Sequence, residues 1–572
     1  MRMSAVQRIS VVCAQHPWRT LGVWLVVLGL ALASSALFLG SALTTEGEIR
    51  TEPDSIKGFN LLEERFPARD EVTELVVVRS ETGSVDDPGV QAAVVGLRDD
   101  IAAAEAVRDV GDPFGAGAER LVSADGAAVL LPVVMNDAEG ADPTVGIIDV
   151  IDAVELVDAE DGVAATITGN WTLSNDFLVV SQHDLEKGEM QFGLPAALVV
   201  LLLVFGAVVA ALVPLAIALA SIVLALGISA VVGQAVDLSF FIVNMVVAMG
   251  LALGIDYTLF IASRYREERH AGLSKQGAIA VCGATASKAV LFSGLSFVVA
   301  LLGLLLVPDT VLRSLAFGAV VVGLVTVVAA LTLLPATLAL LGDRIEWGRI
   351  PFIPRQHGGE SRFWRRAVAL VTRRPALTVV VTSTALLALA LPVLGLQTGS
   401  SGLTALPDET VGQQGFAALN ASFPEGARTS PAQVVIDAPV TTPDVVSSVE
   451  RLRDLVAADQ AFGASTVTTA PEGDLGLVEV ALAGDPASSQ ATAAIERLRE
   501  DYVPAAFEGV DAEVYVTGIT AFNLDYAALI DRWLPIVIGF VLTLSFLLLL
   551  VFRSVVLPLK AVVLNLLSVG AA

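Results

Sequence analysis

A lone acidic residue inside an apolar segment is the feature of this sequence most capable of chemistry. Asp256 is the only charged residue of Leu238–Ala262, which reads LSFFIVNMVVAMGLALGIDYTLFIA. A charge at membrane depth costs about 3 kcal/mol or more, so such residues typically mark transport pathways or proton relays. A carboxyl group in a medium of low dielectric favours its neutral form, so it can load and release a proton as its surroundings change. The pattern therefore predicts a proton-relay residue.

Two hydroxyl groups near this carboxyl could take part in a relay. Tyr257 follows Asp256 directly, and its hydroxyl can donate or accept a hydrogen bond. Ser293 lies within another apolar segment, with Lys288 near its start, and both are candidate polar partners. Simpler roles stay open, because a serine in a membrane helix often bonds its own backbone and a lysine at a helix end can anchor at the interface.

Other positions on the same segment predict how its helix packs. Gly250 and Gly254 are one turn apart, which allows another helix to approach closely. Helical phase places Tyr257 near this glycine stripe and Asp256 about 100° away, on the stripe of Phe260. A structural interpretation remains open for all of these, with the glycines and Phe260 as packing residues and Asp256 as a hydrogen-bonding group that fixes helix packing.

The sequence does not support several other chemistries. An intramembrane aspartyl protease needs two facing carboxyl groups, but Asp256 stands alone and lacks a Gly-x-Gly-Asp context. No G-x-x-x-x-G-K-[ST] phosphate loop occurs, so ATP-driven transport is not indicated. The four histidines and two cysteines form no cluster with metal-ligand spacing. We therefore expect no metal, no cofactor and no enzymatic activity, and we predict a secondary active transporter.

Nine apolar segments approach or exceed the length of about 18 residues that a membrane-spanning helix needs. They are Leu21–Leu43, Phe192–Leu212, Leu215–Val232, Leu238–Ala262, Ala289–Val307, Val311–Leu341, Leu377–Leu396, Trp533–Phe552 and Val555–Ala572. The fold predicted from them is an α-helical polytopic membrane protein.

Charge predicts how these spans are oriented. The net charge is −26, and the acidic excess lies between the first and second spans and between the seventh and eighth. Arginine and lysine gather instead at the N-terminus, at 264–275 and at 344–374. Because short positively charged loops stay in the cytoplasm, we expect a cytoplasmic N-terminus and two external acidic domains on a plasma-membrane protein. The acidic surface also argues against a nucleic-acid partner.

These patterns divide the chain into eight parts. They are a cytoplasmic N-terminus (1–20), a first span (21–43), an external porter domain (44–191), the second to sixth spans (192–341), a cytoplasmic basic linker (342–376), a seventh span (377–396), a second external porter domain (397–532), and an eighth and partial ninth span (533–572). In both external domains, strand-like alternation and helical spacing follow one another in a way that predicts α+β, ferredoxin-like βαββαβ units.

The order of one span, an external domain and further spans occurs twice, which predicts a tandem repeat. Landmarks recur at a near-constant offset: Pro17 with Pro375, Gly58-Phe59 with Gly415-Phe416, Phe66-Pro67 with Phe423-Pro424, Thr168-Gly169 with Thr517-Gly518, and Asp176-Phe177 with Asp525-Tyr526. The second half is incomplete, because a counterpart of Asp256 would lie beyond residue 572. We therefore expect a C-terminally truncated chain, with a natural short form as the alternative.

The segment GLALGIDYTLFIASRYREE (Gly250–Glu268) resembles the fourth-helix signature of the MmpL-type branch of the resistance–nodulation–division superfamily. The repeat order and the paired segments VFGAVVAALVPL and VFRSVVLPL resemble the same family. The resemblance implies proton-driven export of lipids or other hydrophobic molecules. It implies Asp256 and Tyr257 as relay residues, Ser293 as a polar position near them, and Phe260 at a position where inhibitors of lipid exporters bind. The tenth-helix relay partners fall outside this sequence.

Two other hypotheses remain beside lipid export. One is an auxiliary membrane protein, such as a SecDF-like export helper or a sterol-sensing-like sensor, and the other is a drug efflux pump. The expected partners are protons, membrane lipids and a hydrophobic substrate. Related proteins occur as trimers and as monomers, so a homo-oligomer is compatible with the resemblance.

Overall fold

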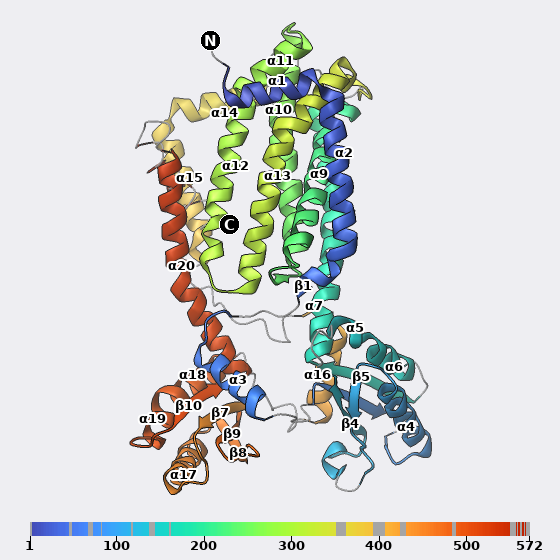
Figure 1. Cartoon of the computed structure of the whole chain (residues 1–572), viewed down its shortest axis with the longest axis vertical. Helices are drawn as coiled ribbons and strands as arrows, with labels where there is room; N and C mark the ends of the chain where they lie inside the picture. The colour runs from blue at the N-terminus through green and yellow to red at the C-terminus, as the bar shows by residue number, and fades with distance from the viewer. Residues whose placement is uncertain are drawn as a thin grey trace. The chain divides into compact units, whose positions relative to one another are not determined.

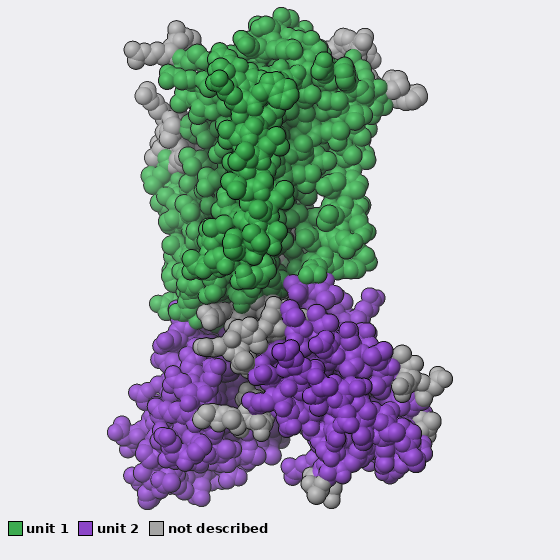
Figure 2. Space-filling view, turned by 45° about the vertical axis from the view of Figure 1, so that its right-hand side comes forward, with its two compact units in different colours: residues 1–50, 181–397, 532–572 green, residues 51–180, 398–531 purple. Residues whose placement is uncertain are grey.

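The chain folds into two compact units (Figure 2). The computed structural model describes residues 3–44, 49–66, 72–81, 83–115, 118–136, 143–158, 162–350, 362–392, 406–423, 431–482 and 488–549, with a few single residues after 549. Unit 1 comprises residues 1–50, 181–397 and 532–572, and unit 2 comprises residues 51–180 and 398–531.

Unit 1 is built from helices that are mostly apolar. They are α1 (Ala5–Gln15), α2 (Pro17–Phe38), α8 (Leu194–Phe205), α9 (Val208–Val232), α10 (Ile242–His270), α11 (Lys275–Ala284), α12 (Ala286–Leu302), α13 (Thr310–Leu341), α14 (Arg362–Arg373) and α15 (Pro375–Ala390). Helices α7 (Asn170–Asp184) and α20 (Ile519–Leu549) belong to both units.

Seven helical stretches among the described residues are long and apolar enough to cross a membrane. They are Pro17–Phe38, Asn170–Phe205, Val208–Val232, Ile242–His270, Lys275–Leu306, Thr310–Glu346 and Ile519–Leu544. Each overlaps one of the predicted spans, so the prediction of a multi-pass membrane protein is confirmed. The predicted span Leu377–Leu396 corresponds to the shorter helix α15, and Val555–Ala572 lies outside the continuously described residues.

The predicted boundary between the second and third spans is wrong. The sequence suggested a break before Leu215, but α9 begins at Val208 and runs through Pro214. The break lies at Gly206, whose φ of 65° is left-handed and whose N–H donates to the Leu202 carbonyl. Glycine adopts this conformation without a steric penalty. A proline inside a membrane helix is tolerated because neighbouring groups satisfy the freed carbonyl. The second helical stretch also begins at Asn170 rather than Phe192.

Helix α10, which carries Asp256, is held between two neighbouring helices. It packs against both α9 and α13, which run beside it, and α2 packs on the other side of α9 (Figure 1). Helix α1 lies across α11 and α13. The short strands β1 (Leu43–Thr44) and β6 (Leu238–Ser239) pair in parallel near the start of α10. Small side chains dominate the contacts of α9 and α13, so the backbones of the three helices lie close together.

Unit 2 contains two four-stranded antiparallel sheets. The first consists of β2 (Glu74–Ser80), β3 (Val107–Val110), β4 (Ala128–Met135) and β5 (Val163–Gly169), in the order β3-β4-β2-β5. The second consists of β7 (Ala432–Asp437), β8 (Phe462–Thr469), β9 (Leu475–Leu482) and β10 (Glu513–Thr517), in the order β10-β7-β9-β8. The sequence prediction missed β3, whose four residues are too few to show alternation and which pairs irregularly with β4.

Helices flank both sheets. The first sheet is accompanied by α4 (Pro88–Ala102), α5 (Pro143–Gly146) and α6 (Ile148–Asp158), and the second by α17 (Pro443–Ala457), α18 (Ser489–Arg497) and α19 (Val503–Ala506). Alternate strand residues point into each helix-covered core, where the side chains are almost completely buried. Burying apolar surface contributes about 25 cal/mol of stability per Å², so these apolar faces hold each sheet to its helices.

Two further helices are exchanged between the sheets. Helix α3 (Asp54–Arg65) precedes the first sheet in the chain but packs on β10 of the second. Helix α16 (Val411–Ser422) precedes the second sheet but packs on β5 and β2 of the first. A Cβ atom on Gly58 of α3 would lie 3.2 Å from the Cβ of Thr517, and one on Gly415 of α16 would overlap the Ile167 carbonyl. Both glycines therefore allow a helix to lie directly on a strand.

Candidate functional site

The site predicted from the sequence lies on α10, and its two glycines set how closely that helix approaches α9. A Cβ atom on Gly254 would lie 2.6 Å from the backbone Cα of Ala218, and one on Gly250 would lie 2.4 Å from Cγ1 of Ile222. Both glycines are buried. They contact neighbouring helices directly, which agrees with the packing interpretation of these positions.

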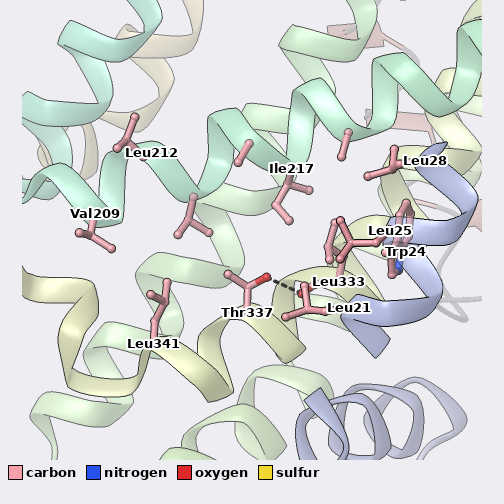
Figure 3. Close-up of a pocket in the computed structure, with 13 residues that line it drawn as sticks. Leu21, Trp24, Leu25, Leu28, Val209, Leu212, Ile217, Leu333, Thr337 and Leu341 are labelled. Carbon is pink, nitrogen blue, oxygen red and sulfur yellow. Dashed lines mark hydrogen bonds between the residues drawn. The ribbon is translucent and has the colours of Figure 1, made fainter. Parts of the chain in front are cut away.

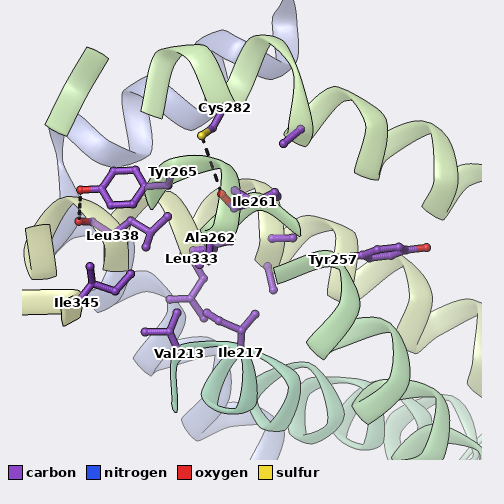
Figure 4. Close-up of a cluster of buried hydrophobic side chains, with 14 of the residues drawn as sticks. Val213, Ile217, Tyr257, Ile261, Ala262, Tyr265, Cys282, Leu333, Leu338 and Ile345 are labelled. Carbon is purple, nitrogen blue, oxygen red and sulfur yellow. Dashed lines mark hydrogen bonds between the residues drawn. The ribbon is translucent and has the colours of Figure 1, made fainter. Parts of the chain in front are cut away.

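Tyr257 and Ser293 are brought together by the packing of α10 against α12. The Tyr257 side chain is 8% exposed, and its hydroxyl lies near the Ser293 side chain, with which it interacts electrostatically. Figure 4 shows the Tyr257 hydroxyl directed away from Ile261 and Tyr265, which belong to the apolar cluster on the same helix. Two hydroxyl groups from different helices therefore lie close together in an otherwise apolar region.

Gly294 is a residue of this site that the sequence analysis missed. A Cβ atom at this position would lie 3.5 Å from Cε2 and 3.6 Å from the hydroxyl oxygen of Tyr257, and 2.2 Å from Cγ2 of Val327 on α13. Gly294 thus leaves room for the tyrosine ring between α12 and α13. Its position directly after Ser293 was a visible signal, but only the tertiary contact explains it.

Asp256 lies on a different face of α10 from Tyr257. Its side chain is exposed, as is that of Phe260 one turn later, which is 51% exposed. Among the residues that the structure describes, no basic side chain forms an ion pair with Asp256, and its charge acts on the hydroxyl of Tyr257, the next residue in the chain. The carboxyl group therefore faces an open side of α10, whereas the hydroxyl pair lies on another face.

Lys288 does not contact this carboxyl in the part of the chain described. Its Nζ lies 5.9 Å from the ring centroid of Phe292 on the same helix, and the lysine is exposed. This geometry is a cation–π contact and agrees with an anchoring position near the start of α12.

The basic end of α10 has a defined structural role that the sequence did not reveal. Tyr265 is fully buried and donates its hydroxyl to the Leu338 carbonyl (Figure 4). Arg266 donates from Nε to the Glu346 carboxylate at 2.7 Å and lies 5.3 Å from the Phe205 ring centroid. The end of α10 is therefore tied to α8 and to the turn after α13, in addition to any effect of its charge on orientation.

The segment after α13 completes this junction. Backbone N–H groups of Val208 and Val209 donate to the carbonyls of Gly348 and Trp347, and Ile350 donates to Gly206. The helix break at Gly206 is thus covered by the chain that follows α13. Within the described residues, no three His, Cys, Asp or Glu side chains are grouped so that they could hold a metal ion.

Comparison with known proteins gives a consistent family. Residues 50–395 and 404–572 match the model of the MMPL family. The chain is 33% identical over 510 residues to the membrane protein SCO6666 of Streptomyces coelicolor, an alignment covering 88% of this chain and 68% of that protein. It is 29% identical over 592 residues to the mycolic acid-containing lipids exporter MmpL11 of Mycolicibacterium smegmatis, covering 99% and 60% respectively.

A further relative carries a different functional name. The chain is 32% identical over 418 residues to the heme uptake protein MmpL11 of Mycobacterium tuberculosis, covering 71% of this chain and 42% of that protein. The chain thus spans 42% to 68% of the length of these three relatives. Because the family model matches nearly all residues after Ile49, including the whole of α10, this protein belongs to the MMPL family.

Proposed function

We propose that this protein is a proton-driven exporter of lipids or other hydrophobic molecules across the plasma membrane. Its multi-pass helical unit and its membership of the MMPL family support a transporter rather than an enzyme. The relative from Mycolicibacterium smegmatis is named as a lipid exporter, which supports a lipid as the cargo.

The observation that carries the proposal is the lone exposed carboxyl of Asp256, next in the chain to Tyr257, whose hydroxyl lies near that of Ser293 on α12. Asp256 takes up a proton on the exposed side of α10, and the two hydroxyl groups extend the proton's path from α10 to α12. Protonation neutralises the Asp256 carboxyl and removes the cost of holding a charge at membrane depth. The face of α10 that carries Asp256 then favours an apolar environment over an aqueous one. Each proton that crosses gains about 2.3 kcal/mol per 100 mV of membrane potential.

The glycines and Phe260 have supporting roles in this proposal. Gly250 and Gly254 hold α10 against α9, so that the face carrying Asp256 keeps a fixed direction. Phe260 lies one turn further on the same exposed face, where it shields the carboxyl from one side.

We also propose that the chain is organised as a tandem repeat with an N-terminus in the cytoplasm. Both sheets follow the element order of a βαββαβ unit, and both place the fourth strand beside the first, which supports ferredoxin-like porter domains outside the membrane. The arginines at the ends of α10 and α13 support a cytoplasmic location for that end of unit 1.

Replacement of Asp256 by Asn in the full chain tests the relay. Purified protein is reconstituted in vesicles with an imposed pH gradient, and proton flux and movement of a fluorescent lipid are measured together. Asp256→Asn is expected to lower both to the level of protein-free vesicles while the melting temperature stays unchanged. The matched control is Asp237→Asn, an exposed aspartate just before β6, which should transport normally. Normal transport by Asp256→Asn would contradict the proposal.

One relative is named as a heme uptake protein, which favours a second candidate function. In it, the hydrophobic cargo is a porphyrin that moves inward. The same vesicles loaded with heme or with lipid distinguish the two cargoes and their directions. Proton flux that accompanies a drug-like amphiphile but neither lipid nor heme would indicate drug efflux. Flux with none of these cargoes would instead favour an auxiliary or sensory role.

A further inference from the structure

An apolar slot in unit 1 lies between α2, α9 and α13, away from the site on α10 (Figure 3). Its volume is about 420 Å³, which is within the range of about 300–1,000 Å³ typical of small-molecule sites. Leu21 and Trp24 form one wall, Ala216 and Ile217 a second, and Leu333 a third. The slot lies near the end of the unit where α2 and α9 begin and α13 ends.

The polar groups on the slot wall are already satisfied. Thr337 donates its hydroxyl to the Leu333 carbonyl at 2.9 Å (Figure 3). Trp24 donates from Nε1 to the Thr332 hydroxyl at 3.2 Å, and Trp24 is 7% exposed. A ligand in this slot therefore needs no hydrogen-bonding groups, and a hydrocarbon chain matches it best. Water would find no free partner there, so the slot favours an apolar occupant.

An arginine and a tryptophan lie where the slot meets the end of α13. Arg344 lies three residues after the slot-lining Leu341, and the Trp347 carbonyl accepts from the N–H of Val209, which also lines the slot. Trp347 is 60% exposed and packs its ring 5.4 Å from the guanidinium carbon of Arg344. Exposed tryptophans and arginines are typical of the membrane interface.

The acidic residues near this end are engaged elsewhere. Asp343 pairs with Arg269, and Glu346 pairs with Arg266. In the described part of the chain, no ion pair is found for Arg344. A cation at one end of an apolar slot therefore matches a negatively charged head group attached to a hydrocarbon chain.

We propose that this slot binds one acyl chain of an anionic phospholipid from the surrounding membrane, with its head group held by Arg344. The apolar wall recognises the acyl chain, and the guanidinium group distinguishes an anionic from a zwitterionic head group. This lipid is a resident ligand, and its site is separate from the relay on α10.

Quenching of Trp24 fluorescence by brominated lipids tests the site directly. The full chain is reconstituted in phosphatidylcholine vesicles that contain phosphatidylglycerol, with bromine on the acyl chains of one lipid or the other. The signal of Trp24 is the difference between the native chain and Trp24→Phe. Thr332 keeps a partner in that variant because it also donates to the Val328 carbonyl. Brominated phosphatidylglycerol should quench Trp24 at a several-fold lower mole fraction than brominated phosphatidylcholine. Equal quenching by the two lipids would overturn the proposal.

Two substitutions distinguish binding of the lipid's acyl chain from binding of its head group. Ala216→Leu fills the slot and should reduce quenching by both lipids, whereas Ala33→Leu, at an exposed position of α2 outside the slot, should not. Arg344→Gln should abolish the preference for phosphatidylglycerol and keep quenching by phosphatidylcholine. Arg365→Gln, an exposed arginine of α14, is its control. A preference that survives loss of Arg344 would overturn the head-group assignment, even if Ala216→Leu failed to fold.

Discussion

The Asp176 carboxylate accepts a hydrogen bond of 2.7 Å from the backbone N–H of Gly412, which lies 236 residues later in the chain. Gly412 is in the first turn of α16, so Asp176 caps the helix that packs on the first sheet. Asp525 does the same for the other exchanged helix, because it accepts from the backbone N–H of Ser55 at 3.1 Å. A carboxylate at a helix N-terminus satisfies free N–H groups and interacts favourably with the helix dipole.

These two caps should stabilise the exchange of α3 and α16. Asp176→Ala and Asp525→Ala, which remove the accepting oxygens, are each expected to lower the free energy of unfolding of unit 2. We expect about 1–2 kcal/mol for Asp176, the usual cost of losing a cap. We expect about 3 kcal/mol for Asp525, because its replacement also leaves the Arg499 guanidinium, 15% exposed, without its ion-pair partner. Chemical denaturation of the full chain in detergent measures both changes.

Asp184→Ala is the matched control for these caps, since Asp184 lies on α7 but is exposed. It should change stability by less than about 0.5 kcal/mol. An equal loss in the control and in Asp176→Ala would mean that the charge of α7, rather than the cap, is responsible.

Glu74 should make the stability of unit 2 depend on pH. It is completely buried at the start of β2, and its carboxyl accepts from the backbone N–H groups of Trp171 and Thr172. Burial raises the pKa of Glu74 from 4.5 to about 7, while the hydrogen bonds from Thr172 and Trp171 partly oppose this. At a pH between 4.5 and about 7, the Glu74 carboxyl keeps its proton in the folded protein but releases it in the unfolded chain. The free energy of unfolding therefore falls as pH rises through this range.

The size of this effect is about 3 kcal/mol at most. Glu74→Gln cannot titrate and should remove this part of the slope of melting temperature against pH. Glu81→Gln, at an exposed position just after the same strand, should leave the slope unchanged. An unaltered slope in Glu74→Gln would show that another group causes it.

The hydroxyl pair predicts coupled effects on transport. Tyr257→Phe and Ser293→Ala should each reduce proton flux, because each removes one of the two neighbouring hydroxyl groups on α10 and α12. The double variant should be no slower than the more impaired single variant, since both substitutions break the same link. Proton flux in reconstituted vesicles measures all three. Effects that multiply in the double variant would show that the two hydroxyls act independently.

The approach of α10 to α9 should tolerate no added side chain at Gly254. Gly254→Ala places a methyl group 2.6 Å from the Ala218 backbone, so α10 must move away, at a cost of about 1–3 kcal/mol. Gly29→Ala on α2 is the control, because nothing lies within 4 Å of its added Cβ atom. The melting temperature in detergent should fall for the first and stay the same or rise slightly for the second.

The junction at the end of α10 should depend on Arg266 more than on Arg264. Arg266 is 14% exposed and its partner Glu346 is 25% exposed, so Arg266→Ala leaves a half-buried carboxylate with only the longer 3.9 Å pair to Arg349 and loses the contact with Phe205. We expect a loss of about 2–3 kcal/mol. Arg264 is 43% exposed and pairs with Glu267 and Glu268, so Arg264→Ala should cost at most about 1 kcal/mol. Thermal melting of the two variants in parallel tests this order.

Much of unit 1 could be predicted from the sequence because hydropathy and helical spacing are local properties. The apolar runs predicted the positions of the seven long helical stretches, and the lone charge in Leu238–Ala262 identified α10. The family signature on that helix agrees with the MMPL family match. Chemistry at Asp256 and Tyr257 was suggested by the same local pattern, and it stays a prediction.

Only the tertiary structure decided the contacts between residues that are distant in the chain. Hydropathy cannot distinguish a break at Gly206 from one near Pro214, because both lie in one apolar run and the difference depends on the segment after α13. The repeated landmarks Asp176 and Asp525 were visible in the sequence, but their role as caps requires helices hundreds of residues away. Periodicity determines which residues share a face, whereas packing determines what that face meets.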